Sequence, residues 1–374
     1  MRTELSIQDK RWQLHRYPPE QQHVSLQAWD AADEYIYQYL QENPELQMQQ
    51  TAVLNDDFGA LACMLPTQIC AWYSDSKVAA LAMQQNWHKN VQSTPEFSVH
   101  NNLSDLPDNT TQAILKLPKN NSFLAEQLIT LRALLPKGAL VITAGKANQI
   151  QKSTLALFEK HLGSTHTSLA VKKARLIFTR VNKTLSSQSK FPLRWPVENS
   201  GLQIANLANV FSSTSLDIGA RFLLEHLPDC QNKQILDLGC GNGVLSVHAA
   251  QQKPAKIHCV DESAMAVASA QLTLQANFPA IPAAFFHSNS LEQVPVEQLD
   301  VILCNPPFHQ QNTITDHIAW QMFNDAKKAL KKGGELRIVG NRHLNYHEKL
   351  KRLFGGCKVV ASNRKFVILS SIKR

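Results

Sequence analysis

QILDLGCGNG, at residues 234–243, is the stretch that decides the fold. Its apolar start predicts a short buried strand, and the glycines at 239, 241 and 243 permit a tight turn that a ligand can approach closely. The apolar pattern that resumes at Val244 predicts the start of a helix. A strand, a glycine turn and a helix in this order are typical of an α/β domain that binds a nucleotide-like ligand at the turn.

Strands and helices alternate through the second half of the chain. We predict strands at 234–238, 256–262, 283–289, 301–307 and 335–341, and helices that start at 243 or cover 263–278 and 318–333. Such alternation predicts a parallel sheet with helices on both faces. Ligands then bind at the carboxyl ends of the strands, where the glycine turn also lies.

The first half of the chain follows the plan of the second. The matched pairs are 27–40 with 214–227, 51–65 with 233–247, 137–146 with 332–341, and 155–181 with 349–373. Four landmarks in one order predict a tandem duplication of a Rossmann-like domain, with chance similarity between two α/β domains as the alternative. The Ser-, Pro- and Asn-rich segment 184–201 predicts a linker and the entry to the second domain, so we expect domains at 1–188 and 189–374.

The acidic residue before the glycines selects the ligand. Asp237 would repel a pyrophosphate and suits a ligand with a positive amino-acid end, such as S-adenosylmethionine. Asp261 ends the next strand, 24 residues later, and can bind two hydroxyls of a ribose. Asn289 ends the third strand and can bond an adenine edge, although an Asx turn is the alternative. The predicted cofactor residues are Asp237, Gly239, Gly241, Gly243, Asp261 and Asn289.

A second motif, Asn305-Pro306-Pro307-Phe308, follows an apolar strand. Two prolines make this turn rigid, so the side-chain oxygen of Asn305 and the carbonyl of Pro306 are held side by side. Two fixed acceptors can bind both hydrogens of an –NH2 group, and Phe308 offers a face for stacking a base. A proline-capped strand with a core phenylalanine is the structural alternative. Beside a cofactor turn, the motif favours chemistry on an exocyclic amine.

Composition limits the class of protein. The 374 residues are 44% hydrophobic and 18% charged, as in a globular protein of two domains. No apolar run reaches the roughly 18 residues that span a bilayer, and the N-terminus lacks the apolar core of a secretory signal. Seven scattered cysteines form no CxxC pair or zinc-type cluster. We expect a cytoplasmic monomer without a membrane segment, a disulfide or a metal.

Charge is unevenly distributed around a net +8. Residues 146–194 contain ten Lys or Arg and one acid, and residues 326–374 contain fourteen and two. Two basic stretches on an otherwise acidic chain favour a polyanionic partner such as nucleic acid. A solvated basic face kept for solubility is the alternative.

The chain resembles the bacterial large-subunit ribosomal RNA guanine-N2-methyltransferases, which act on guanine 1835 of 23S rRNA. The motifs that carry the resemblance are 237–243, VDES (260–263) and CNPPFHQQ (304–311), with 26–40, 54–63 and 171–178 in the first half. A sister family methylates a 16S rRNA guanine at N2. The resemblance spans the whole chain and implies S-adenosylmethionine as methyl donor, with 23S rRNA or a large-subunit assembly intermediate as partner.

The resemblance also implies a first domain that has lost methylase function. The first half has Asn55-Asp56-Asp57-Phe58-Gly59 where the second has its glycine turn, and Leu117-Pro118-Lys119 where the second has the Asn-Pro-Pro-Phe motif. We expect this degenerate copy to help hold RNA through Lys172, Lys173 and Arg175.

Two other functions stay open on the sequence. The same four-residue motif also serves methylation of adenine N6 in DNA and of glutamine in proteins, because each substrate presents an –NH2 group. The other alternative is a non-enzymatic RNA-binding assembly factor, which the intact glycine turn and Asn-Pro-Pro-Phe motif disfavour.

Overall fold

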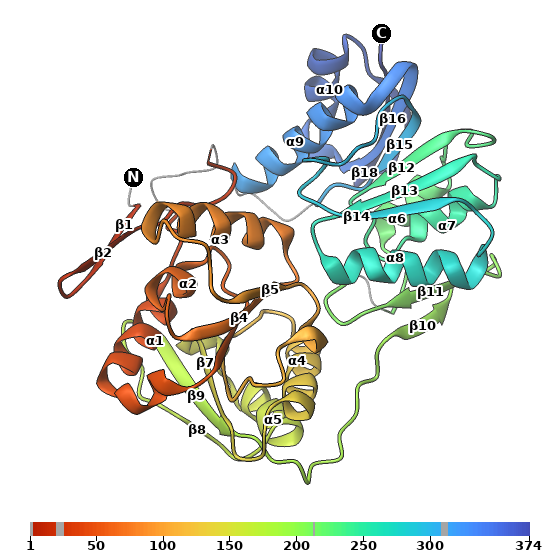
Figure 1. Ribbon diagram of the computed structural model, residues 1–374. Coiled ribbons are helices and arrows are strands. Elements are labelled where there is room, and N and C mark those ends of the chain that lie inside the picture. Colours follow the sequence, from red (N-terminus) through yellow and green to blue (C-terminus); the bar gives the residue numbers. More distant parts are fainter. Residues whose placement is uncertain (1–2, 20–25, 212–213, 308–312) are drawn as a thin grey trace. The chain divides into compact units, whose positions relative to one another are not determined.

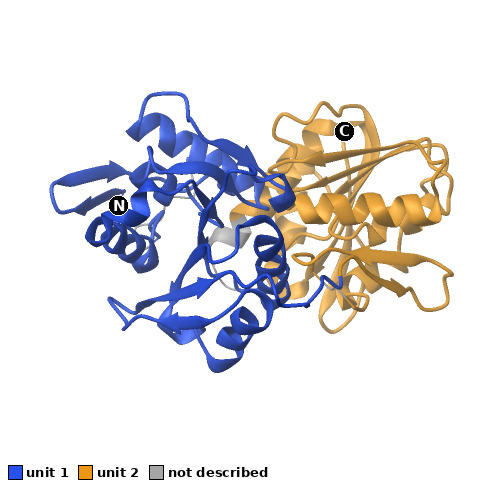
Figure 2. Cartoon of the chain, turned by 60° about the horizontal axis from the view of Figure 1, so that its bottom comes forward, with its two compact units in different colours: residues 1–190 blue, residues 191–374 orange. Residues whose placement is uncertain are grey.

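The computed structural model describes residues 3–19, 26–211, 214–307 and 313–374, and the chain divides into two compact units (Figures 1 and 2). Unit 1 is Met1–Lys190 and unit 2 is Phe191–Arg374. The strand orders of their seven-stranded sheets are β5-β4-β3-β6-β7-β9-β8 and β14-β13-β12-β15-β16-β18-β17. The two orders are the same, and in each sheet the first five strands are parallel while the last two run antiparallel to their neighbours. The α/β fold and the tandem duplication are therefore confirmed.

The elements of unit 1, with η for a 3₁₀ helix, are β1 (Glu4–Ile7), β2 (Lys10–Gln13), α1 (Ala31–Glu42), η2 (Pro44–Met48), β3 (Thr51–Leu54), α2 (Ala60–Met64), β4 (Ile69–Tyr73), α3 (Lys77–Asn90), β5 (Ser98–His100), η3 (Leu103–Asp105), β6 (Gln112–Lys116), α4 (Asn121–Leu134), β7 (Leu140–Lys146), η4 (Ala147–Gln149), α5 (Lys152–His161), β8 (Thr165–Thr167) and β9 (Ala174–Arg180). Those of unit 2 are β10 (Leu193–Pro196), β11 (Gln203–Asn206), α6 (Ile218–Leu224), β12 (Gln234–Leu238), α7 (Val244–Ala250), β13 (Lys256–Asp261), α8 (Ala264–Asn277), β14 (Ala283–His287), β15 (Leu299–Cys304), α9 (Thr313–Ala329), β16 (Leu330–Asn341), η5 (Arg342–Leu344), α10 (Tyr346–Phe354), β17 (Lys358–Ser362) and β18 (Phe366–Ile372).

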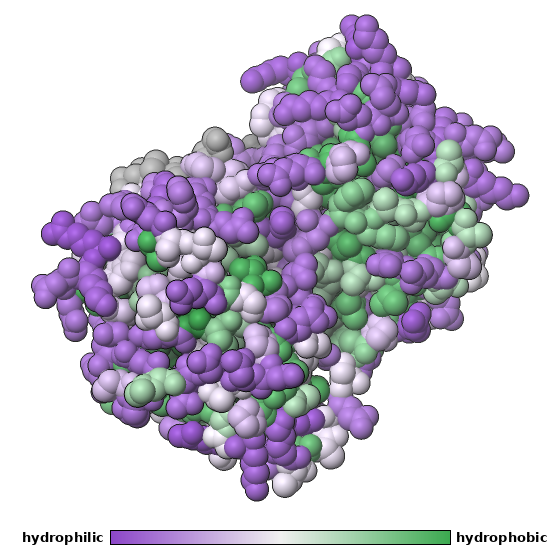
Figure 3. Space-filling model, in the orientation of Figure 1, coloured by the Kyte–Doolittle hydropathy of each residue, from purple (hydrophilic) through white to green (hydrophobic). Residues whose placement is uncertain are grey.

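Alternation along the strands of unit 2 gives its sheet two apolar faces. Ile235 packs in one core together with residues of α6, α7 and α8, whereas Leu236 packs in a second core with residues of α9 and α10. Successive side chains of a strand point to opposite faces, so a strand covered on both sides reads as continuously apolar. On the face drawn in Figure 3, hydrophilic residues cover most of the surface.

Equivalent glycines begin the first helix after the central strand of each sheet. Gly59 precedes α2 with φ of 74°, and Gly243 precedes α7 with φ of 77°. A Cβ on Gly59 would lie 2.5 Å from the Cα of Met83, and one on Gly243 would lie 2.8 Å from the Cα of Ala270. Both positions need glycine, because the backbone is left-handed and the next helix is in contact.

A side-chain clamp recurs in both units. Asn90, at the end of α3, accepts from the backbone N–H of Gln13 and donates to its carbonyl, at 2.7 and 2.9 Å. Asn277, at the end of α8, makes the same two bonds with Gln203, at 2.9 and 2.7 Å. Each clamp ties a two-stranded hairpin, β1–β2 or β10–β11, to the helix beside it. This pair supports the duplication independently of strand order.

One predicted boundary is wrong. The helix predicted for 318–333 ends at Ala329, and Leu330 begins β16 by pairing with Leu299. A Cβ on Gly334 would lie 2.7 Å from the Leu299 carbonyl, so this glycine permits the close approach of the two strands. Within 184–201, strand β10 lies at the start of unit 2 and pairs with β11 alone, so it has no two-sided apolar pattern.

Lys116 occupies the place in unit 1 that Asn305 holds in unit 2. Leu54 of β3 pairs with Leu115 of β6, as Leu238 of β12 pairs with Cys304 of β15. The residue after Leu115 is Lys116, and the residue after Cys304 is Asn305. The ammonium of Lys116 lies 2.8 Å from Asp30 Oδ1 and 2.5 Å from Asp33 Oδ1.

The surroundings of Lys116 are buried and acidic. Burial raises the pKa of Asp33 to about 7, although the Lys116 ammonium opposes this shift. Burial also acts to lower the pKa of Lys116, but the Asp33 and Asp30 carboxylates outweigh it and hold that pKa above its usual range. An ion-pair cluster thus stands where unit 2 has its Asn-Pro-Pro motif.

We expect Lys116→Ala to lower the free energy of unfolding by about 3 kcal/mol, because it leaves the buried Asp33 carboxyl without its cation. Urea unfolding followed by tryptophan fluorescence measures this, since Trp12, Trp29, Trp72 and Trp87 all belong to unit 1. Lys119→Ala, at an exposed position three residues on, is the control and should change stability by less than about 0.5 kcal/mol. Equal effects of the two variants would contradict the assigned role.

Candidate functional site

The glycine turn of unit 2 presents its backbone to a ligand. Gly239, Gly241 and Gly243 all have left-handed φ, at 77°, 52° and 77°. Apart from Gly241 and its two chain neighbours, no described residue has an atom within 4 Å of the place that a Cβ of Gly241 would occupy, so the backbone here is open to a ligand. The Gly241 N–H donates to Asp261 Oδ2 at 2.9 Å, which ties the turn to the end of β13.

Asp237 is fully buried at the end of β12. Its Oδ2 accepts from the Ser246 N–H at 3.1 Å and from the Ser246 hydroxyl at 2.6 Å. Its Oδ1 is buried and has no partner among the described residues. Burial raises the pKa of Asp237 to about 6, the Ser246 bonds act against this, and the nearby Asp261 charge adds to it. A free buried carboxylate oxygen beside an open glycine turn fits the positive amino group of an amino-acid-like ligand.

Asp261 ends β13, and Asn289 lies two residues beyond the end of the neighbouring strand β14. Asp261 Oδ1 accepts from the Ser263 N–H at 3.0 Å, and the Asp261 carbonyl accepts from the Ser288 N–H at 2.9 Å. The second bond places Asn289 next to the end of β13. The Asn289 amide donates to Glu292 Oε2 at 3.1 Å, so the residue lies in a turn. The structure brings both residues to the edge that carries the glycine turn, and their predicted contacts with a ribose and an adenine stay predictions.

Asn305 directly follows β15 at the same edge of the sheet. β12 and β15 are paired neighbours, so the glycine turn and Asn305 leave adjacent strands. The Asn305 Oδ1 is buried and has no hydrogen-bond partner in the described part of the chain. Pro306 is buried and Pro307 is exposed. Phe308 lies outside the described residues.

Asn206, on β11, is a site residue that the sequence reasoning missed. Its Oδ1 accepts from Trp195 Nε1 at 3.0 Å and from Asn242 Nδ2 at 3.3 Å. The orientation of Asn242 is set by the Val244 N–H, which donates to its Oδ1, so the Asn206 Nδ2 is left over. That Nδ2 is buried without a partner in the described ranges. A buried unpaired donor beside the glycine turn fits an anionic ligand group such as a carboxylate.

Asn341 is a second missed residue. It ends β16, the strand next to β15, and its Oδ1 is also buried and unpartnered among residues that the structure describes. A lone Asn on a separate strand carries no sequence signal, so only strand pairing brings it to the edge of the reaction site.

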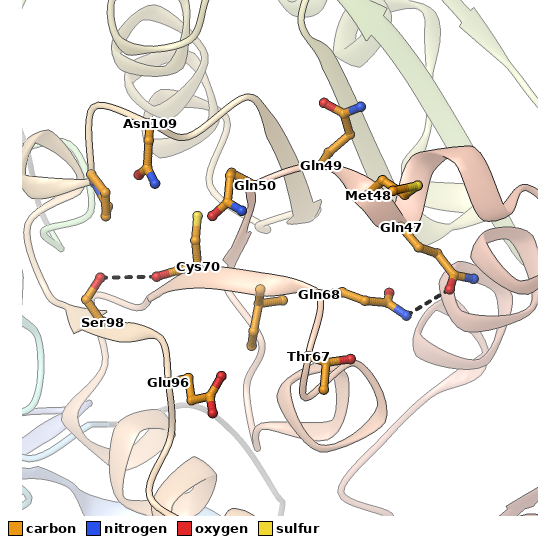
Figure 4. A pocket seen from close by; sticks show the side chains of 12 residues that line it. Gln47, Met48, Gln49, Gln50, Thr67, Gln68, Cys70, Glu96, Ser98 and Asn109 are labelled. Carbon is orange, nitrogen blue, oxygen red and sulfur yellow. Dashed lines mark hydrogen bonds between the residues drawn. The ribbon is translucent and has the colours of Figure 1, made fainter.

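A separate cavity of about 650 Å³ lies in unit 1, at the amino ends of β3 and β4 (Figure 4). Side-chain amides dominate its lining, and Gln68 donates to Gln47 at 3.1 Å. Its position at the amino ends of strands sets it apart from the predicted site, which lies at carboxyl ends in unit 2.

The predicted RNA contacts of unit 1 lie on the hairpin between β8 and β9. Lys172 and Lys173 form its two-residue turn, both with left-handed φ, at 48° and 68°, which costs a lysine energy. Lys172 is exposed but lies 2.7 Å from Glu34. Lys173 is exposed, whereas Arg175 is half-buried and its Nε has no partner among the described residues.

Three further properties bear on the predictions from composition. All seven cysteines are free thiols. Within the described ranges, no group of three or more His, Cys, Asp or Glu residues is arranged to hold a metal ion. The helices described here include none that is long and apolar enough to cross a membrane.

Comparison with known proteins shows to which class of protein this chain belongs. Residues 201–370 match the family model "Methyltransferase small domain". The whole chain superposes on the T. thermophilus 16S rRNA N2 G1207 methyltransferase, solved with AdoMet and guanosine, with a TM-score of 0.79 at 20% identity, covering 100% of this chain and 98% of that one. Together with the glycine turn and the Asn-Pro-Pro motif, the fold defines an S-adenosylmethionine-dependent methyltransferase.

Full-length relatives then identify the family. Residues 2–183 match the model "RLMG N-terminal domain". The chain is 50% identical to the ribosomal RNA large subunit methyltransferase G of Pseudoalteromonas atlantica, with 100% of both chains covered. It is 49% identical to the Aeromonas salmonicida protein of that name, again over 100% of both, and 46% identical to the Erwinia tasmaniensis protein over 99% of each. The chain belongs to the ribosomal RNA large subunit methyltransferase G family.

Protonation of Asp237 should control cofactor affinity. The raised pKa near 6 means that about one-tenth of Asp237 is ionised at pH 5, while an α-amino group with pKa near 8 stays charged to pH 7. Affinity for S-adenosylmethionine, measured by calorimetry, should therefore rise about tenfold from pH 5 to pH 7. In the protein without cofactor, the effect of pH on folding stability has the opposite sign. Because folding raises the pKa of Asp237, the contribution of this carboxyl to the free energy of unfolding falls as pH rises through about 6.

Asp237→Asn should bind the cofactor weakly and with little dependence on pH in this range. A variant that retained the wild-type pH profile would show that another group receives the amino end of the cofactor.

Proposed function

We propose that this chain transfers a methyl group from S-adenosylmethionine to the exocyclic N2 of a guanine in 23S rRNA, at guanine 1835. The observation that carries the proposal is the buried, unpartnered Oδ1 of Asn305, an acceptor that follows the strand next to the glycine turn. The name of the full-length relatives supports a large-subunit RNA, and the substrate named for the structural neighbour supports guanine N2. Naked 23S rRNA or an assembling large subunit fits as partner, and we expect a monomer.

Asn305 and Pro306 would act on the amine of the substrate. The lone pair of a guanine exocyclic nitrogen is delocalised into the ring, which makes it a poor nucleophile. Acceptance of its two hydrogens by the Asn305 Oδ1 and the Pro306 carbonyl returns electron density to nitrogen and fixes its direction. Pro307 stiffens the turn, and Phe308 would stack on a base drawn out of the RNA. A strong base is not required, because the proton can leave during or after transfer.

The cofactor would lie along the ends of β12, β13 and β14. When bound, it supplies an electrophilic methyl group on a sulfonium. Asp237 Oδ1 would take its amino group and the Asn206 Nδ2 its carboxylate, since these are the unpaired buried acceptor and donor near the turn. Asp261 would bind the ribose hydroxyls, and Asn289 an adenine edge. The backbone of Gly239, Gly241 and Gly243 would line the site.

Unit 1 would support RNA binding without catalysis. Lys116, held by Asp30 and Asp33, stands where an amine-binding Asn is needed, and an ammonium cannot accept a hydrogen bond. The turn made by Lys172 and Lys173 supports an RNA contact, because strained backbone at an exposed basic tip is found more often at functional sites.

Asn305→Ala should bind S-adenosylmethionine with wild-type affinity and lose methyl transfer by about 10²–10³-fold, since one preorganised acceptor is removed. Calorimetry measures the first property and transfer of a tritiated methyl group the second. Asn305→Asp, which keeps an acceptor oxygen in place, is the matched control and should retain more activity than the alanine variant. Full activity of Asn305→Ala would exclude the assigned role.

The substrate is tested by the same tritium assay on naked 23S rRNA, naked 16S rRNA and each ribosomal subunit. We expect transfer to 23S rRNA or to a large-subunit particle, with the label recovered as N2-methylguanosine at position 1835. Label in 16S rRNA would favour the sister activity. Label in neither RNA, or label confined to the protein of a ribosomal subunit, would contradict an RNA substrate.

Charge reversal of Lys172, Lys173 and Arg175 to Glu should weaken binding of 23S rRNA and lower the dependence of affinity on salt, because fewer counterions are released. Fluorescence anisotropy over a range of KCl concentrations measures both quantities. Unchanged affinity and slope would remove this hairpin from the RNA-binding surface.

A further inference from the structure

A basic surface in unit 2 lies at the edge of the sheet that carries Asn305. β16 runs parallel to β15, so Asn341 at its end reaches the same edge. β18 is antiparallel to β16, and Asn341 pairs with Phe366, its first residue. η5, which follows Asn341, and the turn at 363–365, which precedes Phe366, therefore lie side by side there. Together they carry three cations, Arg342, Arg364 and Lys365, named here the basic edge.

The backbone of the basic edge is fixed by hydrogen bonds. The Arg342 N–H donates to the Lys365 carbonyl at 3.0 Å, and its Nη1 contacts the Asn363 carbonyl at 3.4 Å. Asn363 Oδ1 accepts from the N–H groups of Lys365 and Phe366, at 2.9 and 2.7 Å. The cations thus stand on a defined turn and helix rather than on a loose tail.

The three cations are exposed and have no ion pair with an acidic residue in the described part of the chain. Three cations near the opposite end of β16 are held by other groups, whereas Lys332 there is exposed and has no ion pair within the described residues. Lys331 pairs with Asp300, Lys328 lies 3.6 Å from Asp325, and the Lys373 ammonium is bonded to the Lys328 and Leu330 carbonyls. Charge at the basic edge is therefore left available for a partner.

The duplicate unit has the same backbone arrangement at this place. In unit 1 the Ala147 N–H donates to the Lys173 carbonyl at 2.8 Å, the same bond that Arg342 makes with Lys365. The cations are placed differently, because unit 1 has Lys146 and Ala147 where unit 2 has Asn341 and Arg342. A basic turn is therefore common to both copies, and the cation at the start of η5 is a feature of unit 2.

We propose that Arg342, Arg364 and Lys365 bind backbone phosphates of the RNA beside the target guanine. This inference rests on the proposed function and adds an RNA contact within the catalytic unit. Phosphate contacts set the position and register of a nucleic acid, which a site that acts on one extruded base requires. Exposed cations that have no acidic partner in the described part of the chain, at the edge where that base must enter, fit a phosphodiester chain.

The test uses the full chain with Arg364→Glu/Lys365→Glu, and Arg342→Gln as a milder second variant. Binding of a 23S rRNA fragment that contains the target guanine is followed by fluorescence anisotropy from low to high KCl. The double variant should bind about tenfold or more weakly, with a slope of log affinity against log salt smaller by about 1.4, the value for two phosphate contacts on single-stranded RNA. KM for RNA should rise while kcat at saturating RNA is kept.

Lys332→Glu/Arg374→Glu is the matched control, because it reverses two exposed cations near the opposite ends of β16 and β18. It should bind RNA far better than the Arg364/Lys365 variant. Calorimetric affinity for S-adenosylhomocysteine should match wild type in every variant, which shows that the fold of unit 2 is intact.

An RNA affinity and salt slope like wild type in both basic-edge variants would overturn the proposal. So would an equal loss in the control, which indicates a general charge effect, or a loss seen only on assembled subunits, which indicates contact with a ribosomal protein. Failure of the proposed function is distinct, because the wild-type chain itself would then neither bind nor methylate the RNA.

Discussion

The parallel pairing of β12 with β13 on one side and β15 on the other is the constraint on which the rest of unit 2 depends. It places the glycine turn between the ends of two strands, so that Asp261 and Asn305 flank it. Hydrogen bonds then refine the arrangement, as when Asp261 accepts from the Gly241 N–H. Residues up to 68 positions apart, from Asp237 to Asn305, become one site because three neighbouring strands end at one edge.

The duplicated unit separates what the fold requires from what the chemistry requires. Both copies keep a left-handed glycine before the first helix and a clamping Asn on a later helix, because these serve packing. Only unit 2 has a side-chain hydrogen-bond acceptor, Asn305, at the end of β15, the strand that corresponds to β6 of unit 1. Unit 1 has Lys116 there, and its ammonium with two carboxylates forms an ion-pair cluster at the position that Asn305 holds in unit 2.

Polar groups left without partners are the clearest mark of function in unit 2. Buried donors and acceptors are nearly always paired, so a cluster of unpaired ones needs an explanation. Asp237 Oδ1, Asn206 Nδ2 and Asn305 Oδ1 are buried and unpaired within the described ranges, and each is at or near the glycine turn or the strand beside it. Their chemical types, two acceptors and a donor, suit a zwitterionic cofactor and an amine.

The sequence by itself determined the α/β class, the duplication, the glycine turn and the position of the Asn-Pro-Pro motif, because these depend on local periodicity and on residues with restricted or permissive backbones. Only the tertiary structure decided that Asn206 and Asn341 join the edge, that Lys116 replaces Asn305 in unit 1, and that β10 and β11 form a separate hairpin at the start of unit 2. Each of these follows from pairing between distant strands or from a side chain on another element. Contacts between distant segments produce no repeating apolar pattern in the local sequence, whereas a buried strand followed by a glycine turn does.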